Sequence, residues 1–305
     1  MKYVYLGPQG TFTEAAVLQV AGPDDELTPL ASVDTALAAV RAGAADLAVV
    51  PIENSVEGGV PQTLDALGNG TALMVVREML VPITFVLAAR AGTKVADVRR
   101  VSSHPHGWAQ CRRWVGEHLP GATYVPALST AAAAEGLSED AAYDAALCSP
   151  MAAQRAGLVV LADDVGDNAS AVTRFVLVSR PGPVGPASGA DKTSVVVFQN
   201  DDHPGGLLEL LEQFATRGIN LTRIESRPTG DALGRYCFSI DCEGHLSQAR
   251  VAEALMGLHR VCSQVRFLGS YPRADGVPAV VGPATSDASF DQARDWLDTL
   301  LTPNP

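Results

Sequence analysis

Long apolar runs are absent from this chain of 305 residues: none reaches the roughly 18 to 20 residues that a membrane-spanning helix needs. The N-terminus enters a strand-like segment at once, without the charged region, apolar core and cleavage site of a secretory leader. Lys and Arg number 22 against 34 Asp and Glu, and no basic stripe offsets the net charge of −12. This balance argues against nucleic acid as a partner. We therefore expect a cytoplasmic protein that binds neither membranes nor nucleic acid.

Cysteine and aromatic residues are also few. The five cysteines are odd in number and lack the spacing of metal ligands, so we expect reduced, buried thiols. His104 and His106 lie two residues apart with no third ligand nearby in sequence, so we expect no metal site. The 47% apolar fraction, rich in Ala, Val and Leu, is typical of a globular protein. The length allows two or more domains with buried cores.

The clearest domain boundary is the segment 180–192, where three prolines and three glycines separate two β-branched runs. Before it, short strands alternate with helical patterns such as 33–42 and 107–118. This alternation predicts an α/β domain of residues 1–180 with largely parallel sheets. The predicted strands span residues 2–7, 27–30, 46–50, 73–76, 82–89, 101–102, 123–125, 146–148 and 175–179.

About 180 residues suffice for two lobes with a cleft between them. Residues 73–89 would carry the chain from one lobe to the other, and residues 173–179 would bring it back. Lobe one would then comprise residues 1–76 and 171–180, and lobe two residues 77–170. The expected shape is that of a solute-binding protein.

A linker of residues 181–192 leads to a second domain, residues 193–272, with a different order of elements. Strands are predicted at 193–199, 220–227, 235–242 and 261–268, and helices at 205–217 and 246–258. This βαββαβ order is typical of a ferredoxin-like fold. The tail, residues 273–305, contains one amphipathic segment at 290–301, which predicts a helix.

Three polar residues, Glu53, Asn54 and Ser55, follow the apolar strand 46–50 after Pro51 and Ile52. In an open α/β sheet, ligands collect at the carboxyl ends of such strands, so these residues are site candidates. Gly58 and Gly59 allow close approach of the backbone, and the apolar spacing beyond them indicates a helix. The alternative is an ordinary strand-to-helix turn with polar capping.

The segment 7–12, Gly-Pro-Gln-Gly-Thr-Phe, also lies between a strand and a helix. It matches neither the glycine pattern of dinucleotide folds nor the Lys-bearing phosphate loop, so we infer no nucleotide cofactor. Its backbone N–H groups and the positive end of the helix suit a carboxylate. Thr11 would bond the same anion, or would serve only as the helix N-cap.

Two further clusters belong to the predicted site. In the segment 103–111, Gln110 and the helix start would face the same cleft as Asn54, although a surface position is the commoner fate of a glutamine. Thr173 opens the return strand beside the hinge between the lobes, followed by Arg174. The alternatives are a good strand former for Thr173 and a solvated or ion-paired surface charge for Arg174.

The second domain offers two segments suited to a small ligand. Residues 202–208 form a loop that enters a helix, and its flexible backbone groups suit both ends of a free amino acid. Residues 220–228 form an alternating strand that ends in charged residues. The alternative for this strand is an edge protected from aggregation by its Glu and Arg side chains.

Taken together, five segments in order resemble the prephenate dehydratase family. They are 7–12 (Gly-Pro-Gln-Gly-Thr-Phe), 51–55 (Pro-Ile-Glu-Asn-Ser), 103–105 with 110–111 (Ser-His-Pro with Gln-Cys), 173–175 (Thr-Arg-Phe) and 225–228 (Glu-Ser-Arg-Pro). The resemblance covers nearly the whole chain. It implies a type II periplasmic-binding-protein-like catalytic domain followed by a ferredoxin-like ACT domain that binds phenylalanine. No chorismate mutase segment precedes Met1, which implies a monofunctional enzyme.

Carried over by position, the resemblance makes Thr173 the principal catalytic residue and adds Glu53, Asn54 and Gln110. It implies substrate binding by Thr11, Ser55, Ser103, Arg174 and Phe175. It implies an effector site made of His203, Gly205, Gly206, Leu207, Leu208, Asn220, Leu221, Glu225, Ser226, Arg227 and Pro228. The family usually has Gly-Ala-Leu where this chain has Gly-Gly-Leu at 205–207, which puts effector strength or choice in question.

The implied reaction converts prephenate to phenylpyruvate, CO2 and water, without a cofactor. Thr173 would donate to the leaving hydroxyl, and a buried, protonated Glu53 would be the proton source. L-phenylalanine would act across a homodimer or homotetramer. Two alternatives stay open: arogenate as the substrate, or a phenylalanine sensor without turnover.

Overall fold

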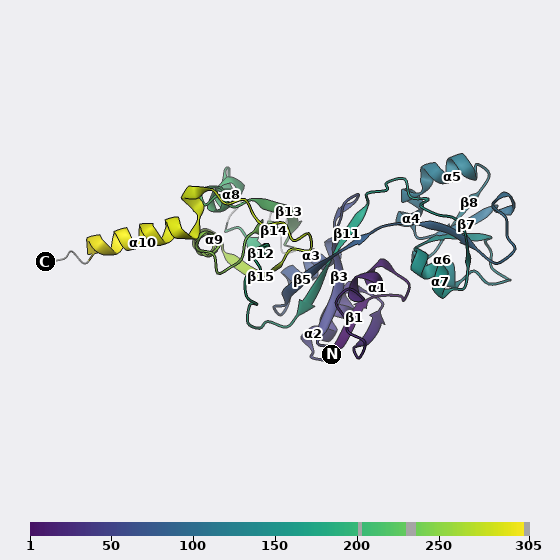
Figure 1. Ribbon diagram of the computed structural model, residues 1–305, viewed down its shortest axis with the longest axis horizontal. Helices are drawn as coiled ribbons and strands as arrows, with labels where there is room; N and C mark the ends of the chain where they lie inside the picture. Colours follow the sequence, from purple (N-terminus) through teal and green to yellow (C-terminus); the bar gives the residue numbers. More distant parts are fainter. Residues whose placement is uncertain (201–202, 230–235, 302–305) are drawn as a thin grey trace. The chain divides into compact units, whose positions relative to one another are not determined.

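The computed structural model describes residues 1–200, 203–229 and 236–301. The chain forms two compact units (Figure 1). The first unit contains Met1–Val60 and Met79–Phe175, and the second contains Pro61–Glu78 and Val176–Pro305. The division at Phe175 lies close to the boundary predicted near residue 180. Residues 61–78 differ from the prediction, because they belong to the unit that contains the C-terminus.

The first sheet has strand order β2-β1-β3-β11-β5, with β4 paired to β3. Its strands are β1 (Lys2–Leu6), β2 (Glu26–Leu30), β3 (Leu47–Asn54), β4 (Gly58–Gly59), β5 (Met74–Pro82) and β11 (Val172–Ser179). Strand β1 runs parallel to both β2 and β3. Helices α1 (Phe12–Val17) and α2 (Val33–Arg41) pack against β1 and β3. The alternation of short strands and helices therefore predicted this region correctly.

The second sheet has strand order β10-β6-β9-β7-β8. Its strands are β6 (Val86–Ala89), β7 (Arg100–Ser103), β8 (Thr123–Pro126), β9 (Ala145–Cys148) and β10 (Val159–Ala162). Strand β7 is parallel to β8 and β9, whereas β6 is antiparallel to β9 and β10. The remaining elements of this lobe are η1 (Val95–Asp97), α4 (Pro105–Gln110), α5 (Arg112–His118), α6 (Thr130–Glu135) and α7 (Pro150–Arg155).

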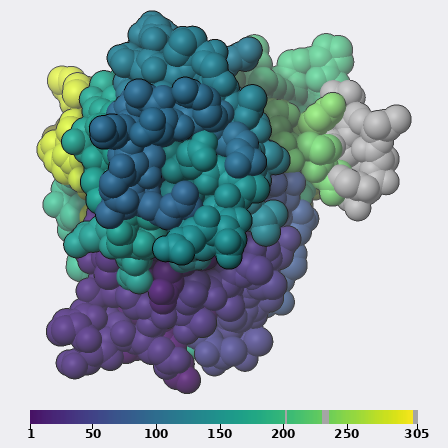
Figure 2. Space-filling view, turned by 90° about the vertical axis from the view of Figure 1, so that its right-hand side faces the viewer, coloured from purple at the N-terminus to yellow at the C-terminus, as the bar shows by residue number. Residues whose placement is uncertain are grey.

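Two segments of the chain connect the first sheet with the second. Strand β5 belongs to the first sheet and β6 to the second, so residues 73–89 do cross between the lobes. At the crossing, the Ile83 N–H donates to the carbonyl of Ala171 at 2.8 Å. Figure 2 shows lobe two, in blue and teal, meeting the purple surface of lobe one.

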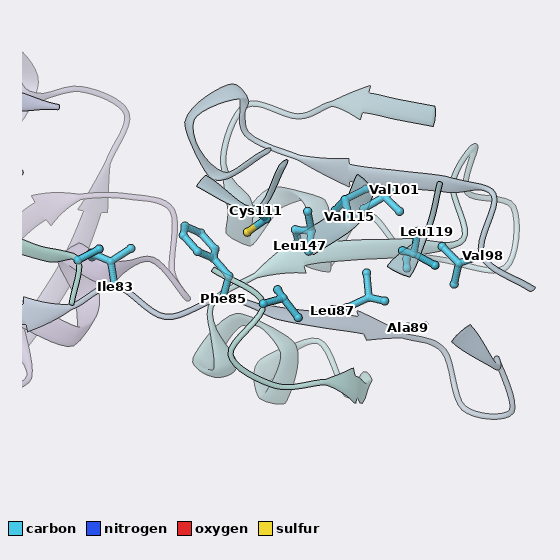
Figure 3. Close-up of a cluster of buried hydrophobic side chains, with 13 residues drawn as sticks. Ile83, Phe85, Leu87, Ala89, Val98, Val101, Cys111, Val115, Leu119 and Leu147 are labelled. Atoms are coloured by element: carbon cyan, nitrogen blue, oxygen red, sulfur yellow. The ribbon is translucent and has the colours of Figure 1, made fainter. Parts of the chain in front are cut away.

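The core of lobe two explains its helices. Three side chains project into one buried cluster (Figure 3): Phe85 from the segment before β6, Leu87 from β6 and Leu147 from β9. Val115 and Leu119 complete the cluster from the side of α5. Residues 115 and 119 are four apart and share a helical face, so burial of this stripe stabilises α5 against the sheet.

The predicted helix 107–118 is wrong in one respect: it is broken at Cys111 into α4 and α5. The cause is Asp167, whose carboxylate oxygens accept from the backbone N–H groups of Arg113 at 2.9 Å and Trp114 at 3.1 Å. A carboxylate at these first N–H groups starts a new helix. Because the capping residue lies 54 positions away, local patterns do not reveal the break.

In the second unit, the βαββαβ order is confirmed, with strand order β13-β14-β12-β15. The elements are β12 (Asp191–Phe198), α8 (Gly206–Ala215), β13 (Leu221–Pro228), β14 (Tyr236–Glu243), α9 (Ala249–Val261) and β15 (Gln264–Pro272). The predicted start of the third strand, Arg235, lies outside the described residues. The second helix continues to Val261, so the last strand begins three residues later than predicted.

Helix α3 (Pro61–Gly68) and the first part of β5 belong to this second unit. Gly269 of β15 lies so close to Val75 that an added Cβ would be 2.1 Å from the Val75 carbonyl oxygen. A glycine is therefore required there. Glu78 accepts from Lys192 Nζ at 2.9 Å, and both side chains are buried. These contacts explain why residues 61–78 depart from the predicted boundary.

The tail forms η2 (Pro283–Thr285) and α10 (Asp287–Leu301), the amphipathic helix predicted from residue 290 onward. It starts three residues earlier than predicted, and Asp287 accepts from the Ala249 N–H at 2.8 Å. Within the described ranges, no helix is long and apolar enough to cross a bilayer.

Candidate active site

Asn54 and Thr173 form the central contact of the site. Asn54 ends β3, Thr173 lies near the start of β11, and Asn54 Nδ2 donates to Thr173 Oγ1 at 2.8 Å. Asn54 Oδ1 accepts the N–H groups of Val56 at 2.8 Å and Glu57 at 3.2 Å, which fixes the amide orientation. Since Thr173 accepts from Asn54, its own proton can be donated elsewhere.

Ser55 holds the two strands together at this point. Its backbone N–H donates to the Val172 carbonyl, and its Oγ accepts from the Val172 N–H, both at 2.9 Å. This reciprocal pair places Thr173 beside Asn54. The Ser55 side chain therefore has a structural task, and its contact with substrate stays a prediction.

Glu53 and Arg174 form an ion pair, with Arg174 Nε donating to Glu53 Oε2 at 3.1 Å. The Arg174 side chain is ion-paired, as one alternative expected, but it is buried, at 7% exposure, so the expected surface position is wrong. The Glu53 side chain is 36% exposed, so the expectation of a buried carboxyl is also wrong.

Gln110 reaches this region from lobe two. It is the last residue of α4, and its Nε2 donates to Glu57 Oε1 at 3.2 Å. The backbone carbonyl of Gln110 accepts from the backbone N–H of Asp167 at 2.6 Å, which fixes the end of α4. The structure thus brings Gln110 to the same turn that Asn54 holds, as expected from the sequence.

The loop 7–12 is used differently from the expectation. The Gly10 N–H donates to Glu14 Oε2 at 2.6 Å, and the Gly10 carbonyl accepts from Ser149 Oγ at 2.8 Å. Gly10 has φ +80°, and an added Cβ would lie 3.2 Å from Ala152 in α7. Thr11 donates to the Pro8 carbonyl at 2.9 Å and makes no side-chain N-cap bond. This loop therefore packs lobe one on lobe two, and the Gly10 N–H is not available to an anion.

Two predicted substrate-binding residues are buried in the sheets. Ser103 is fully buried and donates to the Leu147 carbonyl at 2.8 Å, while Phe175 is 2% exposed in β11. Both side chains contribute to the packing of the sheets, and their contact with substrate stays a prediction. Cys111 is buried as well, which raises the pKa of its thiol and keeps it protonated.

The candidate effector region contains a cavity of about 130 Å³. It is lined by Gln199, Asn200, His203, Gly206, Glu209, Leu210, Val261 and Cys262. Of the predicted effector residues, His203 and Gly206 line this cavity. Gly205 precedes α8 at φ +92°, a conformation that favours glycine. A Cβ on Gly206 would lie 2.9 Å from Gln199 Nε2, so the second glycine leaves room in the cavity.

The other predicted effector residues do not line the cavity. Leu207 and Leu208 are exposed on α8. Asn220 precedes the edge strand β13, which carries Leu221, Glu225, Ser226, Arg227 and Pro228. Arg227 pairs with Asp65 of α3 through Nε–Oδ1 and Nη2–Oδ2, both at 2.8 Å. Within this chain, the predicted effector residues therefore do not form one group: some line the cavity, and others lie on β13.

Comparison with known proteins identifies both domains of the chain. The family model described as prephenate dehydratase matches residues 3–183, and the model described as ACT domain matches residues 194–260. The chain belongs to the prephenate dehydratase family. A curated prephenate dehydratase from Mycolicibacterium vanbaalenii is 49% identical, over 99% of this chain and 98% of the relative.

Two solved structures are also similar. A prephenate dehydratase from Arthrobacter aurescens in complex with L-Phe is 60% identical, covers 99% of both chains and has a TM-score of 0.94. A second structure, described as a novel type of quorum quenching acylases, is 31% identical over 93% of this chain and 99% of its own, with a TM-score of 0.79. The type II binding-protein-like fold and the ACT domain expected from the sequence are confirmed.

Within this member of the prephenate dehydratase family, sequence reasoning overlooked two residues at the site. Glu57 contacts Gln110, and Asp167 caps helix α5, which follows Gln110 in the chain. The available signal for Glu57 was its position in the polar cluster that follows β3. Nothing local pointed to Asp167, because its partners are distant in sequence.

Proposed function

We propose that this chain converts prephenate to phenylpyruvate, CO2 and water. The observation that carries the proposal is the Asn54–Thr173 hydrogen bond, in which Thr173 accepts and keeps its proton for another group. In the reaction, the bond between the ring and its carboxylate breaks, and its electron pair enters the aromatic ring. The bond between the ring and its hydroxyl breaks in the opposite sense: its electron pair leaves on the oxygen, which departs as water after gaining one proton.

Thr173 supplies a hydrogen bond to the departing oxygen. A threonine hydroxyl is too weak an acid to protonate it outright, so Thr173 acts as a donor or relays a proton from water. Asn54 orients the hydroxyl, and Gln110 orients the substrate from lobe two. Arg174, neutralised by Glu53, adds little net charge near the ring carboxylate. A strong countercharge would stabilise that carboxylate and oppose its loss as CO2.

The direct test is phenylpyruvate formation by the purified protein, followed by absorbance in alkali. We expect turnover of prephenate that changes when L-phenylalanine is added. Turnover of arogenate in its place would move the substrate assignment to arogenate dehydratase. Phenylalanine binding without turnover of either compound would identify a sensor. The similarity to a structure described as an acylase raises a different reaction, in which a nucleophile would need a neighbouring base. Thr173 does not have such a base in Asn54, because Asn54 Nδ2 is a donor and cannot take the Thr173 proton.

Regulation is proposed to act through the ACT domain. The L-Phe complex of the Arthrobacter aurescens relative supports phenylalanine as the effector, with the cavity beside α8 and strand β13 as contact regions. Phenylalanine shifts activity only as far as it prefers one arrangement of the catalytic lobes. A cytoplasmic, even-numbered homo-oligomer is part of this proposal, because ferredoxin-like edges pair readily.

The Asp65–Arg227 ion pair predicts a separable effect on regulation. It connects β13 with α3, and α3 begins two residues after Gly59, close in sequence to Asn54. We expect Asp65→Asn to retain basal turnover while the response to phenylalanine falls severalfold, within the usual range of coupling energies. Dose–response curves for phenylalanine measure this change.

The matched control is Asp291→Asn, which removes an exposed ion pair with Arg294 in the same unit. Its phenylalanine response should equal that of the unmodified chain. An unchanged response in Asp65→Asn as well would show that the effector signal does not pass through this ion pair.

A further inference from the structure

Glu57 occupies the turn between β3 and β4, where Glu53 pairs with Gly59 and Asn54 with Gly58. Its backbone N–H donates to Asn54 Oδ1 at 3.2 Å, the same amide whose nitrogen contacts Thr173. The following residue, Gly58, has φ +85°, which the tight turn requires. The position of the Glu57 backbone is therefore tied directly to the Asn54–Thr173 pair.

The Glu57 side chain points to lobe two. Its Oε1 accepts from Gln110 Nε2 at 3.2 Å, and its Oε2 pairs with His106 Nδ1. Both partners belong to α4. The two carboxylate oxygens thus contact two side chains of one helix, while the Glu57 backbone is held by lobe one. A single residue joins the two halves of the site.

We propose that Glu57 is a positioning residue that sets the orientation of the Gln110 amide and its location relative to Thr173. A carboxylate only accepts hydrogen bonds, so it selects the amide nitrogen of Gln110 and excludes the flipped orientation. This inference rests on the proposed role of Gln110 in orienting substrate. It assigns to Glu57 the task of keeping that amide in register with the hydroxyl of Thr173.

His106 has a secondary part in this arrangement. Its side chain is 63% exposed, and exposed ion pairs contribute little to stability. It occupies Oε2 and so leaves Oε1 directed at Gln110. We therefore expect His106→Ala to lower turnover less than Glu57→Ala does.

A double-mutant cycle for prephenate turnover tests the inference. We expect Glu57→Ala and Gln110→Ala each to lower kcat/KM by about tenfold, and the double variant to lose no more than the worse single variant, because contacting residues are non-additive. Glu57→Gln, which keeps an acceptor oxygen and the side-chain length, should recover part of the loss. A merely structural role would not couple Glu57 to Gln110 in this way.

The control is Glu117→Ala, which alters an exposed glutamate of lobe two and should leave kcat/KM unchanged. Thermal unfolding of each variant separates misfolding from loss of positioning. If Gln110→Ala retains full turnover, the proposed role of Gln110 is wrong. If Gln110→Ala is impaired but Glu57→Ala is not, or if their effects multiply independently, the role assigned to Glu57 is overturned while that of Gln110 stands.

Discussion

Replacing Thr173 with alanine is expected to lower kcat for phenylpyruvate formation by about two orders of magnitude or more, the usual scale for a group that assists proton transfer. The variant removes the hydroxyl that accepts from Asn54 at 2.8 Å and retains a proton for the departing oxygen. KM should change less than kcat, because the contact is made mainly as the carbon–oxygen bond breaks. Steady-state kinetics with prephenate measure both parameters.

Two further substitutions separate chemistry from shape. Thr173→Ser keeps the hydroxyl and should recover part of the activity, whereas Thr173→Val keeps the branched shape and should be as impaired as Thr173→Ala. Thr173 is 7% exposed, so thermal unfolding of each variant must show that β11 remains folded. Nearly full turnover by Thr173→Val would remove the hydroxyl from the mechanism.

The features that could be predicted from the sequence depend on short-range patterns. Apolar strands alternating with helical stripes identified the two-lobed domain, and the proline- and glycine-rich segment marked the change to the βαββαβ domain. Asn54 and Thr173 were both selected because they stand at strand ends, where side chains leave the apolar layer. Their contact spans 119 positions, so only the resemblance to a family linked them before the structure did.

The features that could not be predicted depend on distant partners. Glu53 was expected to be buried, but Arg174, 121 positions away, leaves it ion-paired and partly exposed. The backbone N–H groups and helix start of the loop 7–12 suggested an anion site, but the Gly10 N–H donates to Glu14 and Gly10 packs closely against α7. Strand β10 was not predicted, because its valines are exposed at a sheet edge and its run is short.

A second large effect is expected on stability, from the buried ion pair between Arg223 and Asp241 in the second unit. Arg223 Nε donates to Asp241 Oδ2 at 2.9 Å, and Arg223 Nη2 donates to Oδ1 at 3.0 Å. The side chains are 4% and 0% exposed. Asp241→Ala leaves the guanidinium buried without its countercharge, so we expect the free energy of unfolding to fall by about 3 to 5 kcal/mol. Urea unfolding followed by circular dichroism measures this change.

The size of this loss should reflect the cost of a buried, unpaired charge rather than the net contribution of the ion pair to the free energy of unfolding. An apolar double replacement, Arg223→Met with Asp241→Leu, should therefore recover much of the stability lost in Asp241→Ala, because no buried charge remains. Glu26→Ala, which removes an exposed pair with Lys2, is the matched control and should cost less than about 1 kcal/mol. If Asp241→Ala were as stable as Glu26→Ala, water or rearrangement would have to satisfy Arg223, and burial of this pair would not be what the second unit depends on.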